Sequence, residues 1–284
     1  MNMFKSFGGL LIYNLSKINR RVLLLLSGMF VIMTVYWVIG FDVSSTIYWD
    51  PETESAKELT ASIWDCVYSL FSESMLFSTP VFLISMYAAY CSFKNDSFES
   101  PAKIRTGSYM QYVHAKLVFV FLFNLVLCVA AFLLTVCIAA VFLDFQLSWN
   151  SVSVQFKPYM QFYSVGEFGA ITLMTYILVL TCLSCVFGIV VMKLKHHLIG
   201  PVAIVVYLLS QYVILAIDPM LKGANILKLF CMNLYLMIGQ RKLYTEDLYD
   251  FLTVKMGIIL PIAVCIGVYG LALLSLKFKL VQEG

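Results

Sequence analysis

Ionisable side chains are rare inside the apolar segments of this chain, and Glu73 is the clearest candidate for a functional one. It lies in the sequence SLFSESMLF, close to one end of a long apolar run. A carboxylate within a membrane segment is energetically costly, and such residues commonly mark a substrate or ion pathway. Glu73 is therefore predicted either to line a polar vestibule on a substrate path, or only to cap the interface between the segment and water.

Other groupings of reactive residues are weaker. The adjacent His196 and His197 do not share one helical face as an i,i+4 metal pair does, so they are interpreted as part of a basic turn. Cys182 and Cys185 lie within an apolar segment, where cysteine behaves as a small, soft hydrophobic residue. No Gly-Lys dipeptide occurs, which excludes a P-loop for ATP. The chain is thus predicted to be no enzyme, with no metal site and no cofactor of its own.

The composition indicates which elements must position these residues. Hydrophobic residues make up 61% of the chain and charged residues 12%, which is too little polar surface for a water-soluble protein. A helix needs about 20 apolar residues to cross a bilayer. Six spans are predicted, at Val22–Phe41, Leu70–Ser92, Leu117–Phe142, Phe168–Met192, Leu198–Ile217 and Met256–Ser275. The predicted fold is an all-α polytopic membrane protein in which residues 1–284 form a single transmembrane domain.

The basic residues predict the orientation of these spans, because Lys and Arg resist translocation. If both termini are cytoplasmic, that side holds twelve of the 19 basic residues and only three of the 16 acidic ones. The basic ones are Lys5, Lys17, Arg20, Arg21, Lys94, Lys103, Arg105, Lys116, Lys193, Lys195, Lys277 and Lys279. Because they are dispersed and form no clustered patch, binding of nucleic acid is excluded.

Two segments are predicted to contact the membrane without crossing it. Residues 3–18 place apolar side chains at helical spacing, which is typical of an amphipathic helix on the inner surface. Residues 218–250 form an outer connection whose middle, Ile226–Ile238, is apolar but only about 13 residues long. Such a length favours a re-entrant helical hairpin, with a fully interfacial helix as the alternative.

The most polar internal stretch is KNDSFESPAKIRTGSYMQYVHAK, residues 94–116, between the second and third predicted spans. It mixes charged residues of both signs with the aromatic residues Phe98, Tyr109 and Tyr112. Charges give an interface its specificity and aromatic side chains act as packing anchors. The stretch is therefore predicted to dock a partner on the cytoplasmic side. The alternative is an ordinary solvated loop.

The residues around this stretch resemble the permease subunit of type-2 ABC transporters, in the small bacterial size class. Such permeases often have Phe-x-Asn-x-Thr after the second span, then Gly, Ser and Arg, then an aromatic residue and Lys at the third span. This chain has Phe93-Lys94-Asn95-Asp96-Ser97, then Gly107-Ser108-Tyr109, then Tyr112 and Lys116. Ser97 and Tyr109 stand where threonine and arginine are common in the family.

The resemblance implies an exporter subunit of the bacterial cell membrane that moves a hydrophobic or amphipathic substrate, such as an antimicrobial peptide, an antibiotic or a lipid-like compound. Its partners would be two ATPase subunits, which bind ATP and Mg, a second permease copy or paralogue, and membrane lipid. Residues 94–116 would be the cytoplasmic coupling loop and residues 3–18 the connecting helix. The ATPase-coupling residues implied are Phe93, Asn95, Asp96, Phe98, Arg105, Gly107, Ser108, Tyr109 and Tyr112.

Two other classes stay open. A secondary transporter or channel predicts ionisable residues at mid-membrane and repeated broken helices. An integral membrane enzyme would need clustered Asp, Glu or His near an interface. The centres of the predicted spans are almost free of charge, which favours the exporter subunit.

Overall fold

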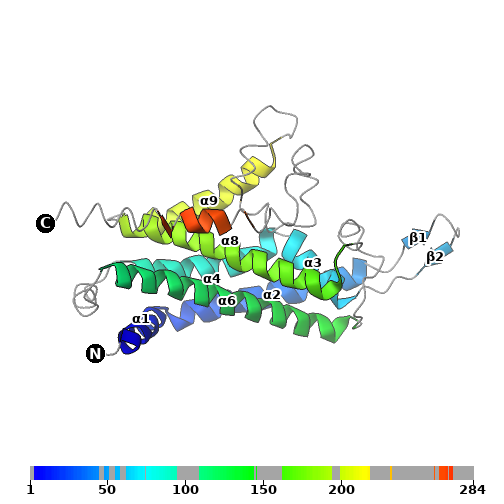
Figure 1. The fold of residues 1–284 in the computed structure, drawn as a ribbon. Coiled ribbons are helices and arrows are strands. Elements are labelled where there is room, and N and C mark those ends of the chain that lie inside the picture. Colours follow the sequence, from blue (N-terminus) through cyan, green and yellow to red (C-terminus); the bar gives the residue numbers. More distant parts are fainter. Residues whose placement is uncertain are drawn as a thin grey trace.

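The computed structural model describes residues 3–44, 48–50, 55–57, 62–73, 75–94, 109–143, 145, 162–193, 199–217, 231, 259, 262–267 and 269–270. This part of the chain is mostly helical (Figure 1). The helices are α1 (Met3–Ser16), α2 (Arg20–Ser44), α3 (Ile63–Glu73), α4 (Met75–Phe93), α6 (Tyr109–Phe142), α8 (Val165–Lys193) and α9 (Ile199–Leu215). Residues 262–267 form a further short helical segment.

Among the described helices, three are long and apolar enough to cross a membrane: Arg20–Phe41, Gln111–Phe142 and Val165–Val191. They coincide with the first, third and fourth predicted spans. The chain is therefore a membrane protein with several spans. The fifth predicted span falls on α9, which is strongly apolar but has 17 residues. Most of the sixth predicted span and of segment 218–250 lies outside the described residues.

The second predicted span, Leu70–Ser92, is not one continuous helix in the structure. α3 ends at Glu73, and α4 begins at Met75. Pro80 lies inside α4 and has no N–H to bond the carbonyl four residues earlier, so it weakens the turn that precedes it. α3 ends on the polar residues Ser72 and Glu73. Glu73 is therefore the last residue of a short helix and does not lie within a long one.

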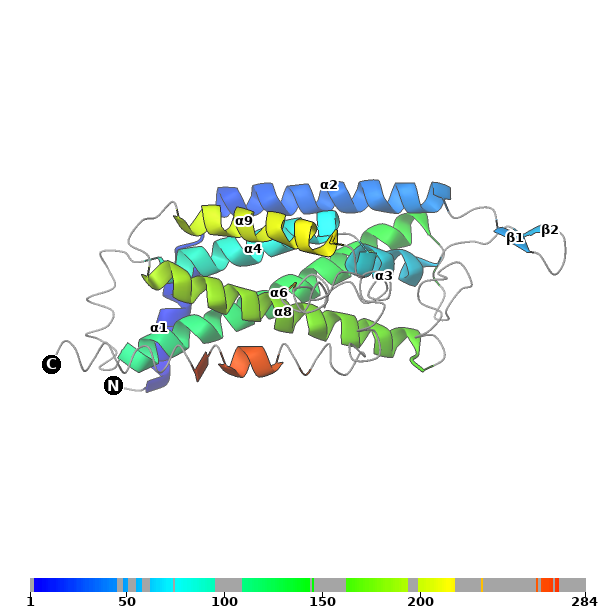
Figure 2. The ribbon, with the colours of Figure 1, turned by 90° about the horizontal axis from the view of Figure 1, so that it is seen from above.

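Four helices, α2, α4, α6 and α8, form the central bundle. α4 packs against α2, α6 and α8, and α6 also packs against α2 and α8. These helices share one long axis and alternate in direction (Figures 1 and 2). The start of α2, the end of α4, the start of α6 and the end of α8 thus meet at one end of the bundle, which we call the α1 end.

The opposite end, which we call the ribbon end, carries a short antiparallel ribbon of β1 (Tyr48–Asp50) and β2 (Ser55–Lys57). In this ribbon Tyr48 pairs with Lys57, and Asp50 pairs with Ser55. The all-α prediction misses the ribbon, because strands of three residues give too short a pattern to detect in sequence.

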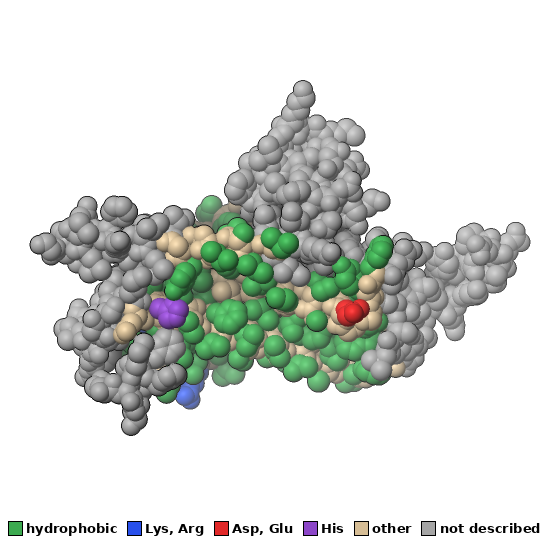
Figure 3. All heavy atoms as spheres, viewed as in Figure 1, with side chains coloured by type: hydrophobic (Ala, Val, Ile, Leu, Met, Phe, Trp, Pro, Cys, Tyr) green, Lys and Arg blue, Asp and Glu red, His purple; other side chains and the backbone are tan. Residues whose placement is uncertain are grey.

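Large apolar side chains are exposed on the sides of the bundle between its two ends (Figure 3). On α2, the residues Leu24, Ile32 and Tyr36 are 70–75% exposed. On α9, Val206 and Val213 are 59% and 66% exposed. Water would disfavour such a surface, whereas lipid chains solvate it, so the exposed sides fit a bilayer environment.

Candidate functional site

The structure describes only part of the predicted coupling set. Phe93 is the last residue of α4, Tyr109 is the first residue of α6, and Tyr112 lies one turn further along α6. The remaining predicted residues fall outside the described part of the chain: Asn95, Asp96, Phe98, Arg105, Gly107 and Ser108. The site is therefore built from the two helix ends that border residues 95–108.

The carboxyl-terminal part of the predicted coupling loop 94–116 is helical in the structure. α6 already begins at Tyr109, eight residues before the predicted third span. The physical reason lies in the sequence YMQYVHAK, where Tyr112, Val113 and Lys116 are buried on one side while Gln111 and His114 are exposed. This spacing is that of an amphipathic helix, and it extends the apolar span toward the polar stretch.

Lys116 is fully buried at the α1 end, although it is charged. Its Nζ lies 4.6 Å from the centroid of the Tyr112 ring and 5.6 Å from that of the Phe93 ring. Aromatic faces attract a cation, and the attraction is stronger where water is excluded. Lys116 thus joins the end of α4 to the start of α6. We call Phe93, Tyr112, Lys116 and Gly188 the stem cluster.

Gly188 brings α8 into the stem cluster. A Cβ atom at this position would collide with Cδ2 of the Phe93 ring, closer than real Cβ contacts allow. Glycine is therefore what lets the Phe93 ring pack directly on the backbone of α8, as small residues commonly do between membrane helices. The end of α4 is therefore packed on α8 through Phe93, and the start of α6 is joined to Phe93 through Lys116; these side chains are almost completely buried.

The segment around α1 is hydrogen-bonded to this end of the bundle. The Ser92 hydroxyl donates to Oδ1 of the buried Asn14 at 3.2 Å. The backbone N–H of Asn19 donates to the Tyr87 hydroxyl at 3.3 Å, and Asn19 Oδ1 accepts from the N–H of Arg21 as an N-cap of α2. Residues Met3–Ser16 form the helix α1, which packs against α4 and α6. The position of this helix on the inner membrane surface stays a prediction.

A ring of neutral polar side chains lies deeper in the bundle and was missed by a search restricted to ionisable residues. The Ser85 hydroxyl donates to Asn124 Oδ1 at 2.6 Å, and the hydroxyls of Ser85 and Ser184 are 2.7 Å apart. Asn124 Nδ2 lies 3.4 Å from both the Thr181 and Ser184 hydroxyls. We call these four residues the polar ring. The lone asparagine in FLFNLVL was the available signal, since an amide in an apolar span needs partners.

The ribbon end is held by aromatic residues. The Tyr68 hydroxyl donates to the carbonyl of Val165 at 2.6 Å, and its ring packs edge-on against Phe168. Burial, followed by the charge of Asp65, raises the pKa of Tyr68 well above its usual range, so the hydroxyl stays a donor. Glu73 ends the α3 helix on which Tyr68 lies. The contacts of Tyr68 with Val165 and Phe168 join α3 to the start of α8.

Among the described residues, no group of three His, Cys, Asp or Glu side chains could hold a metal ion. Cys182 is buried and Cys185 half-buried within α8, and His196 and His197 lie outside the described residues. The described sites consist of hydrogen-bonding and aromatic groups, which suit the packing of helices.

Comparisons with protein-family models, with curated proteins and with solved structures found no match for this chain. Its class therefore rests on its own geometry: a mostly helical membrane protein with several spans, in which the two ends of one polar stretch are anchored in the bundle.

Proposed function

We propose that this chain is the permease subunit of an ATP-driven ABC exporter. It moves a hydrophobic or amphipathic substrate, such as a peptide, an antibiotic or a lipid-like compound, across the bacterial cell membrane with energy from a separate ATPase. The observation that carries the proposal is the stem cluster, in which Phe93 and Lys116 anchor both borders of residues 95–108. A segment that transmits movement from a soluble motor must be firmly joined to the spans, since a loose connection would absorb the movement.

In this proposal the polar stretch is the coupling element. Two ATPase subunits bind ATP and Mg, and each contacts one copy of the polar stretch through Asn95, Asp96, Phe98, Arg105 and the Gly107–Tyr109 segment. A second permease copy or a paralogue completes the transporter. α1 acts as the connecting helix, and its hydrogen bonds through Asn14 and Asn19 support a mechanical link to the same helix ends.

The finer architecture belongs to the same proposal. Six spans cross the membrane, both termini are cytoplasmic, and residues 218–250 form a re-entrant segment on the outer side. Glu73, at the end of α3, contributes to the substrate path near that side. The broken helix at this point supports the proposal, because helix ends leave backbone groups available for a polar vestibule.

Co-purification tests the proposal most directly. The full-length chain, tagged and isolated in mild detergent from its own host, is expected to carry an ATP-binding-cassette subunit in equal amount, identified by mass spectrometry. Isolation of the chain without such a subunit, under conditions that retain other membrane complexes, would contradict the proposal.

Substitution of Lys116 tests the coupling step. Lys116→Met keeps the buried stem but removes the charge, and it is expected to lower ATP hydrolysis by the assembled complex at least fivefold. Lys116→Arg keeps the cation over both rings and should retain more than half of the activity. The matched control is Arg20→Met, which removes an exposed positive charge at the same end of the bundle. Equal activities of the two methionine variants would contradict a role of Lys116 in coupling.

A secondary transporter or channel is the second candidate, and the polar ring is the observation that favours it. Hydroxyl and amide groups at mid-span line substrate pathways in some carriers. The two functions differ in their energy source. If the chain alone, in sealed vesicles, catalyses flux driven by an ion gradient without any ATPase, the second candidate replaces the first.

A further inference from the structure

A cavity of about 310 Å³ lies between α6, α8 and the segment 262–270, separate from the stem cluster. α6 contributes His114, Leu117, Val118 and Phe121, which recur at the spacing of one helical face. α8 contributes Thr181 and Cys185, and the last segment contributes Cys265, Ile266 and Tyr269. Its size is at the lower end of the range in which proteins bind small molecules, about 300–1,000 Å³.

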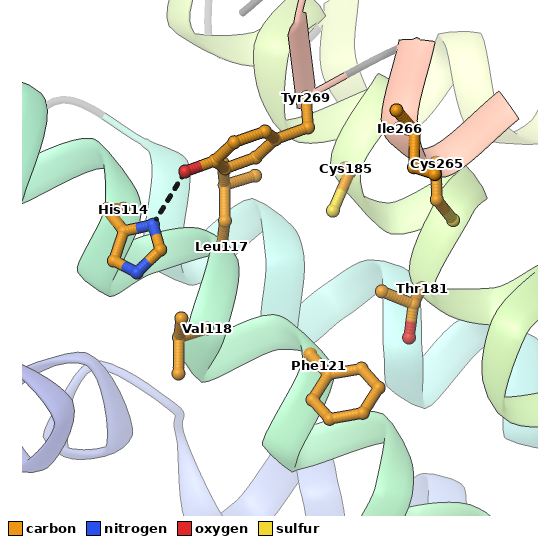
Figure 4. A pocket seen from close by; sticks show the side chains of 9 residues that line it. All are labelled: His114, Leu117, Val118, Phe121, Thr181, Cys185, Cys265, Ile266 and Tyr269. Atoms are coloured by element: carbon orange, nitrogen blue, oxygen red, sulfur yellow. Dashed lines mark hydrogen bonds between the residues drawn. The ribbon is translucent and has the colours of Figure 1, made fainter. Parts of the chain in front are cut away.

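The cavity has one polar rim and an apolar interior. At the rim, Nδ1 of His114 lies 2.9 Å from the Tyr269 hydroxyl, and the two rings meet edge to face (Figure 4). His114 is only five residues into α6, so this rim lies near the α1 end of the bundle. Phe121 is seven residues further along α6, about 10 Å deeper at 1.5 Å per residue. The cavity therefore runs from the membrane interface toward the bilayer centre.

The outer side of the cavity faces the surroundings of the bundle. Ile266 is 67% exposed and Phe121 is 40% exposed, and both line the cavity. Phe121 belongs to the apolar window of α6 that is long enough to cross the membrane. The molecules that surround this part of the protein are lipids, so a lipid chain can enter from the side without passing through water.

The rim offers a hydrogen bond to an entering head group. When His114 donates from Nδ1, the Tyr269 hydroxyl accepts and keeps its own proton for an acceptor on the ligand. Ester and phosphate oxygens of a phospholipid are such acceptors, and an acceptor at Tyr269 favours this tautomer of His114. The polar rim and the apolar interior thus match the two parts of a lipid.

We propose that this cavity is a lipid-binding site, in which one acyl chain of a membrane phospholipid lies between α6, α8 and segment 262–270 while the Tyr269 hydroxyl hydrogen-bonds the ester or phosphate oxygens. The site is independent of the proposed transport function. A resident lipid here fills space that would otherwise be a void between the last segment and the bundle.

Photo-crosslinking tests the site in the full-length protein in dodecyl maltoside micelles, because this detergent has no ester or phosphate oxygens with which to compete for Tyr269. The probe is a phosphatidylglycerol with a diazirine on one acyl chain, added at increasing mole fraction. Labelling of the peptides that contain Phe121 and Cys185 should saturate, whereas labelling of the exposed face of α2 around Ile32 should rise in proportion to the probe. Proportional labelling at both places would mean ordinary boundary lipid and would overturn the proposal.

Matched variants locate the site. Cys185→Phe fills the cavity and is expected to lower saturable labelling at least fivefold, as is Val118→Phe from the opposite helix. Val186→Phe adds a larger aromatic side chain at the next position of α8, which is exposed outside the cavity, and should change labelling less than twofold. Equal effects of Cys185→Phe and Val186→Phe, in variants that elute as single species, would overturn the assignment.

The head-group contact has its own test. Tyr269→Phe removes only the hydroxyl and is expected to weaken binding about two- to tenfold, the range of one hydrogen bond. A diazirine-bearing alkane without a head group should bind wild type and Tyr269→Phe equally. If binding of the phospholipid probe is also unchanged by this substitution, the proposed contact between Tyr269 and the head group is wrong.

Discussion

Asn124 is the side chain on which the interior of the bundle depends most. Its amide accepts from Ser85 on α4 and faces the hydroxyls of Thr181 and Ser184 on α8. Since Ser85 has one proton, which it gives to Asn124, the contact between Ser85 and Ser184 is donated by Ser184. One residue of α6 thereby fixes the register of two neighbouring helices, which apolar contacts alone define less sharply.

Asn124→Leu is expected to lower the free energy of unfolding by about 1–2 kcal/mol, because interhelical hydrogen bonds in membranes contribute about 0.6 kcal/mol on average and up to about 1.7. The measurement is unfolding in mixed micelles with increasing SDS. Thr135→Val is the control, since Thr135 is also buried in α6 but bonds only the carbonyl of Ala131 in its own helix. A cost for Asn124→Leu no larger than that for Thr135→Val would show that the ring does not hold the helices together.

A second prediction at the scale of single residues concerns Gly188. Gly188→Ala should destabilise the bundle by about 1–3 kcal/mol, the usual cost of overpacking, because its methyl group would collide with Phe93. Gly28→Ala is the matched control in α2, where a Cβ atom meets nothing within 4 Å and alanine improves helix propensity by about 1 kcal/mol. Phe93→Leu should relieve part of the cost at Gly188. If Phe93→Leu does not restore stability to the Gly188→Ala variant, the destabilisation does not come from a collision between these two residues.

The helices themselves were largely predictable from the sequence, because long apolar runs leave few alternatives. The first, third and fourth predicted spans match α2, α6 and α8 within a few residues at most ends. The break before α4 was not predicted, since hydropathy averages over Ser72-Glu73-Ser74 and Pro80. The start of α6 was also set too late, because the amphipathic turns before Leu117 look polar when residues are averaged.

The candidate site was only partly visible in the sequence, because it depends on contacts between distant residues. Phe93 and Tyr112 were predicted from their positions around the polar stretch, but nothing in the sequence indicates that Lys116 lies between their rings. Gly188 is one of 15 glycines, and its role follows only from the position of Phe93. The polar ring was missed for a similar reason, since its members come from three helices.

At the scale of secondary-structure elements, the prediction concerns how α1 is held against α4. Ser92→Ala combined with Tyr87→Phe removes two described hydrogen bonds between this segment and α4, so amides of residues 3–18 should exchange with deuterium about three- to tenfold faster. The measurement is hydrogen exchange with mass spectrometry on the purified protein. Ser16→Ala is the control, because this hydroxyl bonds only the carbonyl of Tyr13 within α1. Exchange that is unchanged in the double variant would mean that apolar contacts alone hold α1.

At the scale of the whole molecule, the two ends of the bundle differ in charge and in structure. Among the charged side chains that the structure describes, Lys17, Arg20, Arg21 and Lys94 lie at the α1 end, whereas Asp65 and Glu167 lie at the ribbon end. Glu167 accepts from Ser164, and Asp65 accepts from Ser62, so each acidic group completes the amino-terminal cap of a helix. The described positive side chains therefore lie at the same end as α1, the stem cluster and the polar rim of the cavity.

This asymmetry predicts how the molecule sits in the membrane, because Lys and Arg near span ends are retained in the cytoplasm whereas Asp and Glu contribute little. Trp49→Cys on the ribbon should react with a membrane-impermeant maleimide in intact cells, and Arg20→Cys at the start of α2 should react only after permeabilisation. The wild-type chain is the control for its native thiols, of which Cys137 is exposed on the side of the bundle. Labelling of Arg20→Cys in intact cells would reverse the orientation. It would also place the stem cluster on the side of the membrane without ATP, which would contradict the coupling role proposed for Lys116.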